Sequence, residues 1–64
     1  MTKTLFRALV INANAKENDC DYVVAEDWFD TTVEADYWIA WQSYLNALRY
    51  YDAATRFIYR KEEY

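Results

Sequence analysis

The chain has 64 residues, of which eleven are acidic and seven basic, so its formal net charge is −4. It contains no His, Gly or Pro and only one Cys. These absences exclude an internal disulfide, His-dependent nucleophilic catalysis, a glycine-rich phosphate loop and the usual zinc ligand sets. Because a chain of this length also has little volume for an enclosed pocket, we expect one domain, residues 1–64, that is not an enzyme and holds no cofactor or metal.

The apolar residues are distributed along the chain rather than gathered in one segment. No apolar run approaches the roughly 20 residues of a membrane span, and the first residues lack the pattern of a signal peptide. We therefore expect a cytoplasmic protein with no membrane contact. Three Trp, three Phe and seven Tyr make up 20% of the residues, which predicts an aromatic core.

The first third of the sequence predicts a β-hairpin. In residues 4–13, Leu9 and Ile11 fall on one face of an extended chain and Ala8 and Val10 on the other, so both faces are apolar, which is typical of a central strand. Residues 12–21 form a polar connection. Residues 22–29 alternate again and are predicted to pair with the first strand.

A helix is predicted to follow. Asp30, Thr31 and Thr32 are good N-cap residues, and Glu34 stands three positions after Thr31 as in a capping box. We expect an amphipathic helix of about 18–20 residues whose apolar arc packs on the sheet. That arc contains Val33, Tyr37, Trp41, Tyr44, Leu45, Leu48 and Tyr51, with Trp38 at its edge. Ile39 and Tyr50 then project from the polar face and are compatible with a contact site.

The last segment allows two interpretations. Residues 55–60 are rich in β-branched and aromatic side chains, which favours a third strand, although the helix could also continue through them. Residues 61–64 are expected to form a frayed polar tail. The predicted fold class is therefore α+β, a small antiparallel sheet with one amphipathic helix packed on it, in the order β-β-α-β. The alternative is a β-hairpin followed by one long or broken helix.

The charges are distributed unevenly along the chain. Residues 17–48 carry eight carboxylates and no Lys or Arg, a local charge of −8. A concentrated acidic face repels nucleic acid and anionic membrane and attracts the basic grooves that hold nucleic acid. The window has two interpretations, a merely solvated face or a surface that competes for such a groove. Asp30 and Glu34 have a structural role in either case, because negative charge stabilises a helix N-terminus.

The competing-surface interpretation predicts a set of partner-binding residues and a partner. The carboxylates are expected to gather at one end of the sheet, near the helix start, with aromatic or apolar anchors beside them. The predicted partner is a basic nucleic-acid-binding protein, without direct contact to nucleic acid. The predicted partner-binding residues are Asp19, Asp21, Glu26, Asp27, Asp30, Glu34, Asp36, Trp28, Ile39 and Tyr50.

The short length, net acidity, high aromatic content and strand-strand-helix-strand pattern resemble the small inhibitors that bacteriophages make against host machinery. That class includes anti-CRISPR proteins and inhibitors of host RNA polymerase or restriction enzymes. The resemblance is to a class and covers the chain as a whole, with no residue matched to a family position. It implies a non-enzymatic inhibitor that binds a CRISPR effector, nuclease or polymerase through carboxylates that stand in for phosphates. The alternative function is a structural or assembly subunit that acts through apolar docking or as a homodimer.

Overall fold

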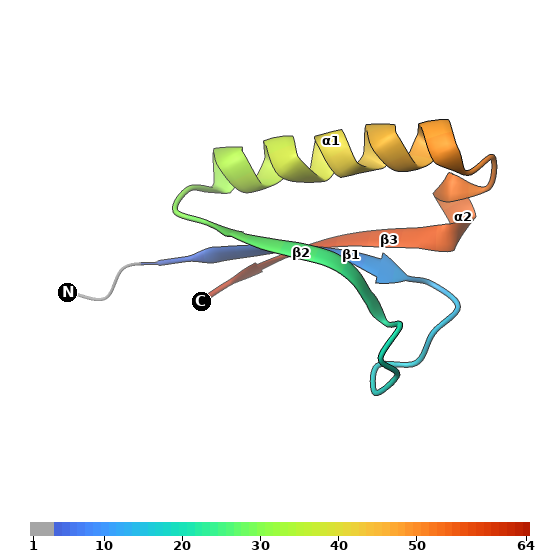
Figure 1. Cartoon of the computed structure of the whole chain (residues 1–64). Helices are drawn as coiled ribbons and strands as arrows, with labels where there is room; N and C mark the ends of the chain where they lie inside the picture. The colour runs from blue at the N-terminus through green and yellow to red at the C-terminus, as the bar shows by residue number, and fades with distance from the viewer. Residues whose placement is uncertain (1–3) are drawn as a thin grey trace.

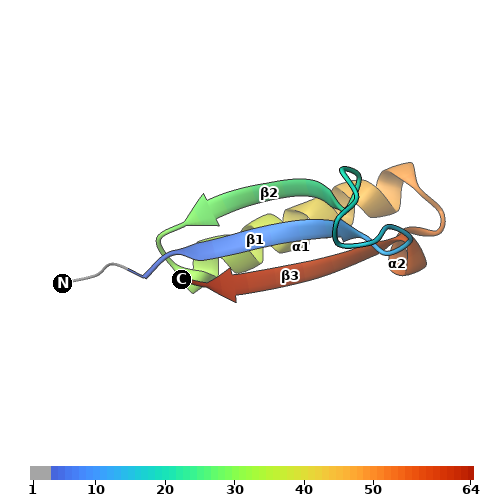
Figure 2. The ribbon, with the colours of Figure 1, turned by 90° about the horizontal axis from the view of Figure 1, so that it is seen from below.

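Three antiparallel strands and one long helix make up most of the computed structural model, which describes residues 4–64. In chain order, the elements are β1 (Phe6–Asn12), β2 (Val23–Phe29), α1 (Thr32–Arg49), α2 (Ala53–Arg56) and β3 (Phe57–Glu63). Helix α1 lies across one face of the sheet (Figure 1). No other helix or strand of the described residues covers the opposite face (Figure 2). The predicted α+β class and the β-β-α-β order are confirmed, with the short α2 inserted before the last strand.

The sheet has the order β2-β1-β3, so β1 is its central strand. This position explains why β1 is apolar on both faces: Ala8, Leu9, Val10 and Ile11 are each at most 3% exposed. Leu9 is opposite Glu26 of β2 and Arg60 of β3. At this position both outer strands therefore carry a charged residue, whereas the central strand carries an apolar one.

The connection between β1 and β2 contains no glycine, and side-chain hydrogen bonds add to the backbone hydrogen bonds that close its turns. The carboxamide oxygen of Asn12 accepts a hydrogen bond from the Asn14 N–H at 3.0 Å, and an Asp19 carboxylate oxygen accepts one from the Lys16 N–H at 3.1 Å. No residue in the described range 4–64 has a positive φ. Short polar side chains thus replace the left-handed residues that such a loop often uses.

Helix α1 begins where the sequence predicts it. Thr31 has extended backbone angles, its hydroxyl oxygen accepts a hydrogen bond from the Glu34 N–H at 3.2 Å, and it donates to the Glu34 carboxylate at 3.0 Å. A cap of this kind contributes about 1 kcal/mol. The helix ends at Arg49, where the Tyr50 N–H bonds to the Asn46 carbonyl at 2.8 Å.

The end of the chain differs in part from the prediction. Residues 53–56 form the helical turn α2, and the third strand begins at Phe57 and continues through residues 61–63, in place of the predicted frayed tail. Backbone hydrogen bonds of 3.0 and 2.8 Å join Leu5 and Tyr64 beyond the ends of the strands. Pairing with β1 supplies the hydrogen bonds here, so tertiary context overrides the polar composition of this segment.

The core between α1 and the sheet is small. Val10, Ala53 and Phe57 form its buried cluster, with Trp38 and Tyr59 packed against them. From α1, Ala35 and Asn46 are buried, and the Asn46 amide donates a hydrogen bond to the Tyr59 hydroxyl at 3.1 Å. This hydrogen bond satisfies a buried polar side chain and ties the helix to β3.

Candidate docking surface on helix α1

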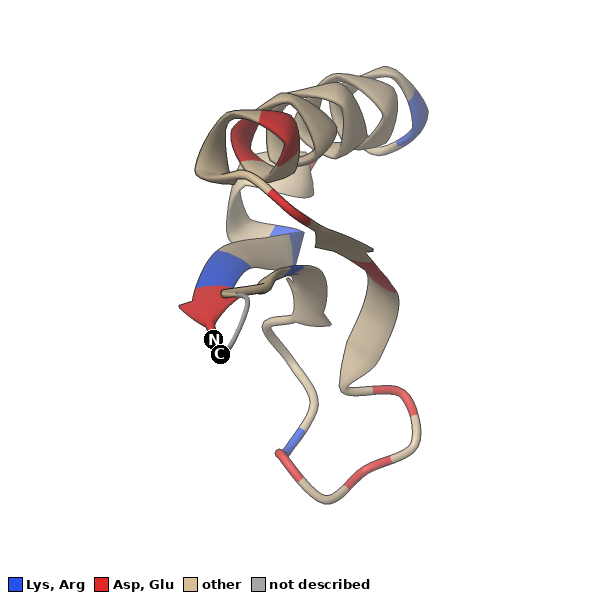
Figure 3. Ribbon diagram, turned by 90° about the vertical axis from the view of Figure 1, so that its left-hand side faces the viewer, with Lys and Arg blue, Asp and Glu red and all other residues tan. Residues whose placement is uncertain are grey.

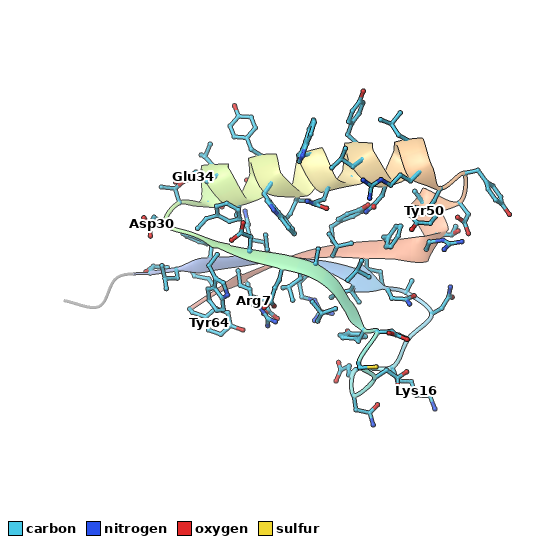
Figure 4. The ribbon with its side chains drawn as sticks, in the orientation of Figure 1. Arg7, Lys16, Asp30, Glu34, Tyr50 and Tyr64 are labelled. Carbon is cyan, nitrogen blue, oxygen red and sulfur yellow. The ribbon has the colours of Figure 1, made fainter. Side chains whose placement is uncertain are left out.

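A row of large apolar side chains on α1 points away from the sheet (Figure 4). We call this set the outer stripe. It consists of Val33 (57% exposed), Tyr37 (74%), Trp41 (56%), Tyr44 (57%) and Leu48 (68%). Single exposed apolar residues are ordinary on protein surfaces, but five in line on one helix form a contiguous patch.

The outer stripe corrects the predicted orientation of the helix. Its residues belong to the arc that the periodicity predicts to pack on the sheet, and that prediction is wrong. The face that packs on the sheet instead carries Ala35, Trp38 and Asn46, two of them buried and Trp38 packed against the core. The small side chain of Ala35 allows the helix to approach the sheet closely, and Asn46 has a hydrogen-bonding partner in β3. Hydrophobic periodicity misses both effects, because it ranks the faces of a helix only by their number of apolar residues.

Two of the predicted anchors lie elsewhere than expected. Ile39 is predicted to project from the polar face of the helix. It is instead half-buried and lies on the same helical face as buried Ala35 and Asn46, so it is no exposed anchor. Tyr50 lies beyond the helix end and packs edge-on against Phe57, with a centroid distance of 5.4 Å. Its ring therefore belongs to the corner that joins α1 to β3.

The third predicted anchor, Trp28, lies on the sheet face opposite α1. Its ring is 5.2 Å from that of Tyr64, and the Arg7 guanidinium lies 5.8 Å from the Trp28 ring centroid. Trp28 is 46% exposed, so it remains accessible, but on the other side of the molecule from the outer stripe. The three predicted anchors do not form one surface.

Two features give the outer stripe its local shape. Trp41 and Tyr44 stack on each other, with ring centroids 5.8 Å apart and planes inclined by 24°. Nearer the helix start, Val33, Asp36, Tyr37 and Ala40 line a shallow hollow of about 280 Å³. The surface therefore offers a raised pair of rings and an apolar recess next to them.

The predicted acidic cluster is divided between the two ends of the sheet. Asp19 and Asp21 lie in the β1–β2 loop, and Asp30 and Glu34 lie at the start of α1, at the other end of β2 (Figures 3 and 4). The seven residues of β2 separate the two groups by about 23 Å. The expectation that these carboxylates meet at one end of the sheet is wrong, because β2 runs its full length between them.

Basic residues from outside the acidic window also neutralise part of it. The Arg7 Nε atom on β1 donates to Glu26 on β2 at 2.8 Å, and Arg7 reaches Glu62 on β3 at 3.3 Å. The Lys61 ammonium lies 2.8 Å from a carboxylate oxygen of Asp36. Antiparallel pairing brings together charges that are far apart in sequence, so the local charge of −8 is not a continuous acidic face.

The remaining predicted acid, Asp27, is exposed on β2. Its carboxylate accepts a hydrogen bond from the Trp28 N–H at 2.8 Å. Because β2 is an outer strand of the sheet, a charged side chain there also opposes edge-to-edge pairing with other chains. Asp27 thus has a structural explanation that requires no partner.

The perturbed pKa values belong to structural ion pairs. Hydrogen bonding to Arg56 lowers the pKa of Asp52, and the same contact raises the pKa of Arg56, whose guanidinium also lies 4.5 Å from the Tyr50 ring centroid. Hydrogen bonding to Glu26 raises the pKa of Arg7. The Asp52–Arg56 pair stabilises the corner after α1, and the Arg7–Glu26 pair stabilises the uncovered face of the sheet. Neither ion pair lies on the outer stripe.

A larger cleft of about 700 Å³ lies between the end of α1 and the end of the sheet that carries the β1–β2 loop. Its lining residues include Asn12, Asp21, Gln42, Arg49 and Arg56. Its charges are mixed, and Arg56 is already engaged by Asp52 through contacts of 3.0 and 3.2 Å. The free thiol of Cys20 also lines this cleft, next to Asp21.

Within residues 4–64, no three His, Cys, Asp or Glu side chains are grouped so that they could hold a metal ion. Neither does any helix in that range combine the length and apolarity needed to cross a membrane. No protein-family model matches the sequence, and the searches of curated proteins and solved structures also found no match.

Proposed function

We propose that this chain is a non-catalytic interaction domain that docks onto another protein surface through the outer stripe of α1. The observation that carries the proposal is the alignment of Val33, Tyr37, Trp41, Tyr44 and Leu48 on the side of the helix that faces away from the sheet. With about 150–250 Å² for each large ring, their exposed parts amount to about 600 Å². That area is at the upper end of the range for the largest apolar patch on a monomer.

The composition of the outer stripe supports docking. Trp and Tyr are over-represented among the residues that dominate binding energy, because they bring a large apolar area with few rotatable bonds. Folding does not account for their exposure, since the helix uses a different face to pack on the sheet. Contact of this aromatic row with water costs free energy, and a partner that covers the row would remove that cost.

Photo-cross-linking tests this proposal even when the partner is unidentified. A photoreactive phenylalanine analogue replaces Tyr44 in one variant and Ser43 in a matched control, and both full chains are irradiated in bacterial cells that express them. Ser43 is exposed on the same helix but lies outside the outer stripe. We expect covalent protein adducts from position 44 and few or none from position 43. Equal adduct yields at the two positions, or none at either, would contradict the proposal.

The inhibitor function suggested by the acidic window is the second candidate. It is supported by the exposure of three acidic residues at the start of α1, Asp30, Glu34 and Asp36, of which Glu34 also accepts a hydrogen bond from Thr31 and Asp36 is paired with Lys61. Salt separates the two candidates. Binding of carboxylates to a basic groove weakens as ionic strength rises, whereas apolar docking through the outer stripe does not.

A further inference from the structure

Resting on the proposed docking function, we infer that the occupant of the outer stripe is the outer stripe of a second copy of this chain, in an antiparallel helix pair with two-fold symmetry. The spacing of the side chains is the first reason. Tyr37, Trp41, Tyr44 and Leu48 follow one another at intervals of four, three and four residues. This is the spacing of a helix seam that packs along a second helix at a shallow crossing angle.

The seam is complementary to itself when the second helix runs in the opposite direction. A two-fold axis that passes between residues 42 and 43 sets Trp41 opposite Tyr44 of the second copy, and Tyr37 opposite Leu48. Both pairs then occur twice, as a two-fold interface requires. The stacked rings of Trp41 and Tyr44 lie at the centre of this arrangement, where each copy contributes one pair to a cluster of four rings.

The hollow on α1 is placed to receive a side chain in the same register. It is lined by Val33, Asp36, Tyr37 and Ala40. The antiparallel pairing brings Leu48 of the second copy next to Tyr37, at this recess, in the manner of a knob entering a hole. Leu48 is 68% exposed in the single chain, so it can reach across without repacking the core.

The charges at the helix ends favour the antiparallel direction. Glu34 lies in the first turn of α1. Antiparallel pairing places the two Glu34 side chains at opposite ends of the helix pair and opposes the two helix dipoles. Parallel pairing would place Glu34 beside Glu34 and align the dipoles, which is unfavourable.

The available area suits a reversible dimer. About 600 Å² from each copy gives about 1,200 Å² in total, the lower end of the range for specific protein interfaces. Interfaces of this size that depend on a few aromatic anchors have affinities on the order of micromolar. Because each copy carries a net charge of −4, added salt reduces repulsion between the copies and should strengthen the pair, the opposite of its effect on binding to a basic groove.

Sedimentation velocity on the full chain tests the inference, with samples at about 10 µM and about 300 µM to bracket micromolar dissociation. We expect conversion from the 7.7 kDa monomer to a dimer across this range. Tyr44→Glu should weaken the dimer at least about tenfold, because each interface loses two rings and gains two charges. Ser43→Glu is the matched control and should dimerise as the wild type does. Far-UV circular dichroism verifies that each variant is folded.

A cysteine pair tests the direction of the helices. In a Cys20→Ser background, Tyr37→Cys and Leu48→Cys are made as separate variants. The antiparallel register predicts efficient disulfide formation only when the two variants are mixed, whereas a parallel pair cross-links each variant with itself. Self-cross-linking of the single variants would overturn the antiparallel arrangement.

The outcomes also separate this inference from the docking function. A wild type that stays monomeric at the highest concentration, or a dimer unaffected by Tyr44→Glu, would overturn the second copy as occupant. If photo-cross-linking at position 44 still gives adducts, and these are larger than twice 7.7 kDa, the docking function stands with a different partner. If position 44 gives no adducts at all, both fail.

Discussion

Two tryptophans three residues apart on α1 should differ sharply in their contribution to stability. Trp38 packs against the buried core cluster, and its ring centroid lies 6.3 Å from that of Phe29. Trp41 belongs to the outer stripe and is 56% exposed. Replacing each in turn by Ala therefore measures which face of the helix is used for folding.

The structure sets the expected magnitudes. Removing a core Trp costs about 3–5 kcal/mol, and because Trp38 is only partly buried we expect Trp38→Ala to cost about 2–4 kcal/mol. A 64-residue domain has roughly 3–10 kcal/mol of total stability, so this is a large share of it. Trp41→Ala should change the free energy of unfolding of the monomer by less than about 0.5 kcal/mol, since Ala also has the higher helix propensity.

Urea unfolding followed by circular dichroism at low protein concentration is the appropriate assay. With a slope of about 1 kcal/mol per molar urea, Trp38→Ala should lower the midpoint by about 2 M or more and Trp41→Ala by less than about 0.5 M. If Trp38→Ala does not fold, Trp38→Phe keeps a ring and should give an intermediate loss. Equal losses for the two tryptophans, or a larger loss for Trp41→Ala, would refute the assigned orientation of α1.

Three further predictions concern the rest of the fold. Thr31→Ala should lower the free energy of unfolding by about 1 kcal/mol, whereas Thr31→Ser keeps the capping hydroxyl and should change it little; thermal unfolding of the two variants checks this. Tyr59→Phe leaves the buried Asn46 amide unsatisfied and should lower the free energy of unfolding by about 1–3 kcal/mol. In a double-mutant cycle with Asn46→Leu, measured by urea unfolding, the double variant should lose less stability than the sum of the two single losses. Because Arg56 lowers the pKa of Asp52 below its ordinary 3.8, this pair should stabilise the fold fully above about pH 3.8 and progressively less as the pH falls through the lowered pKa. In acid-unfolding curves, Asp52→Asn should remove this part of the pH dependence.

The features that could be predicted from sequence are those that depend on nearby residues. The Thr31 cap depends on a side chain three positions later, and the central place of β1 follows from its two apolar faces. Each of these is a short-range rule whose outcome tertiary contacts did not change.

The orientation of α1 could not be predicted in the same way, because the helix has two faces that can pack. The outer stripe has more apolar side chains, but the face with Ala35 and Asn46 matches the sheet in size and hydrogen bonding. The signal that could have revealed this is the small side chain of Ala35, which allows close approach of helix and sheet. Periodicity gives the position of an apolar stripe but not its partner.

The acidic window could not be converted into a binding face for a related reason. Charge that is continuous along the sequence is not continuous in space, because β2 separates Asp19 from Asp30 and pairing across strands brings Arg7 to Glu26. Strand pairing decides both effects, and it is a long-range property. The acids remain exposed surface groups, but their distribution no longer favours one binding face.

The most direct test of the outer stripe as a binding surface is photo-cross-linking. It compares the yield of covalent adducts from position 44 with the yield from position 43. We predict adducts when the photoreactive residue replaces Tyr44 and background levels from the Ser43 control, with an adduct mass of twice 7.7 kDa if the partner is a second copy. Equal yields from the two positions would contradict this function, because the outer stripe would then be ordinary exposed surface.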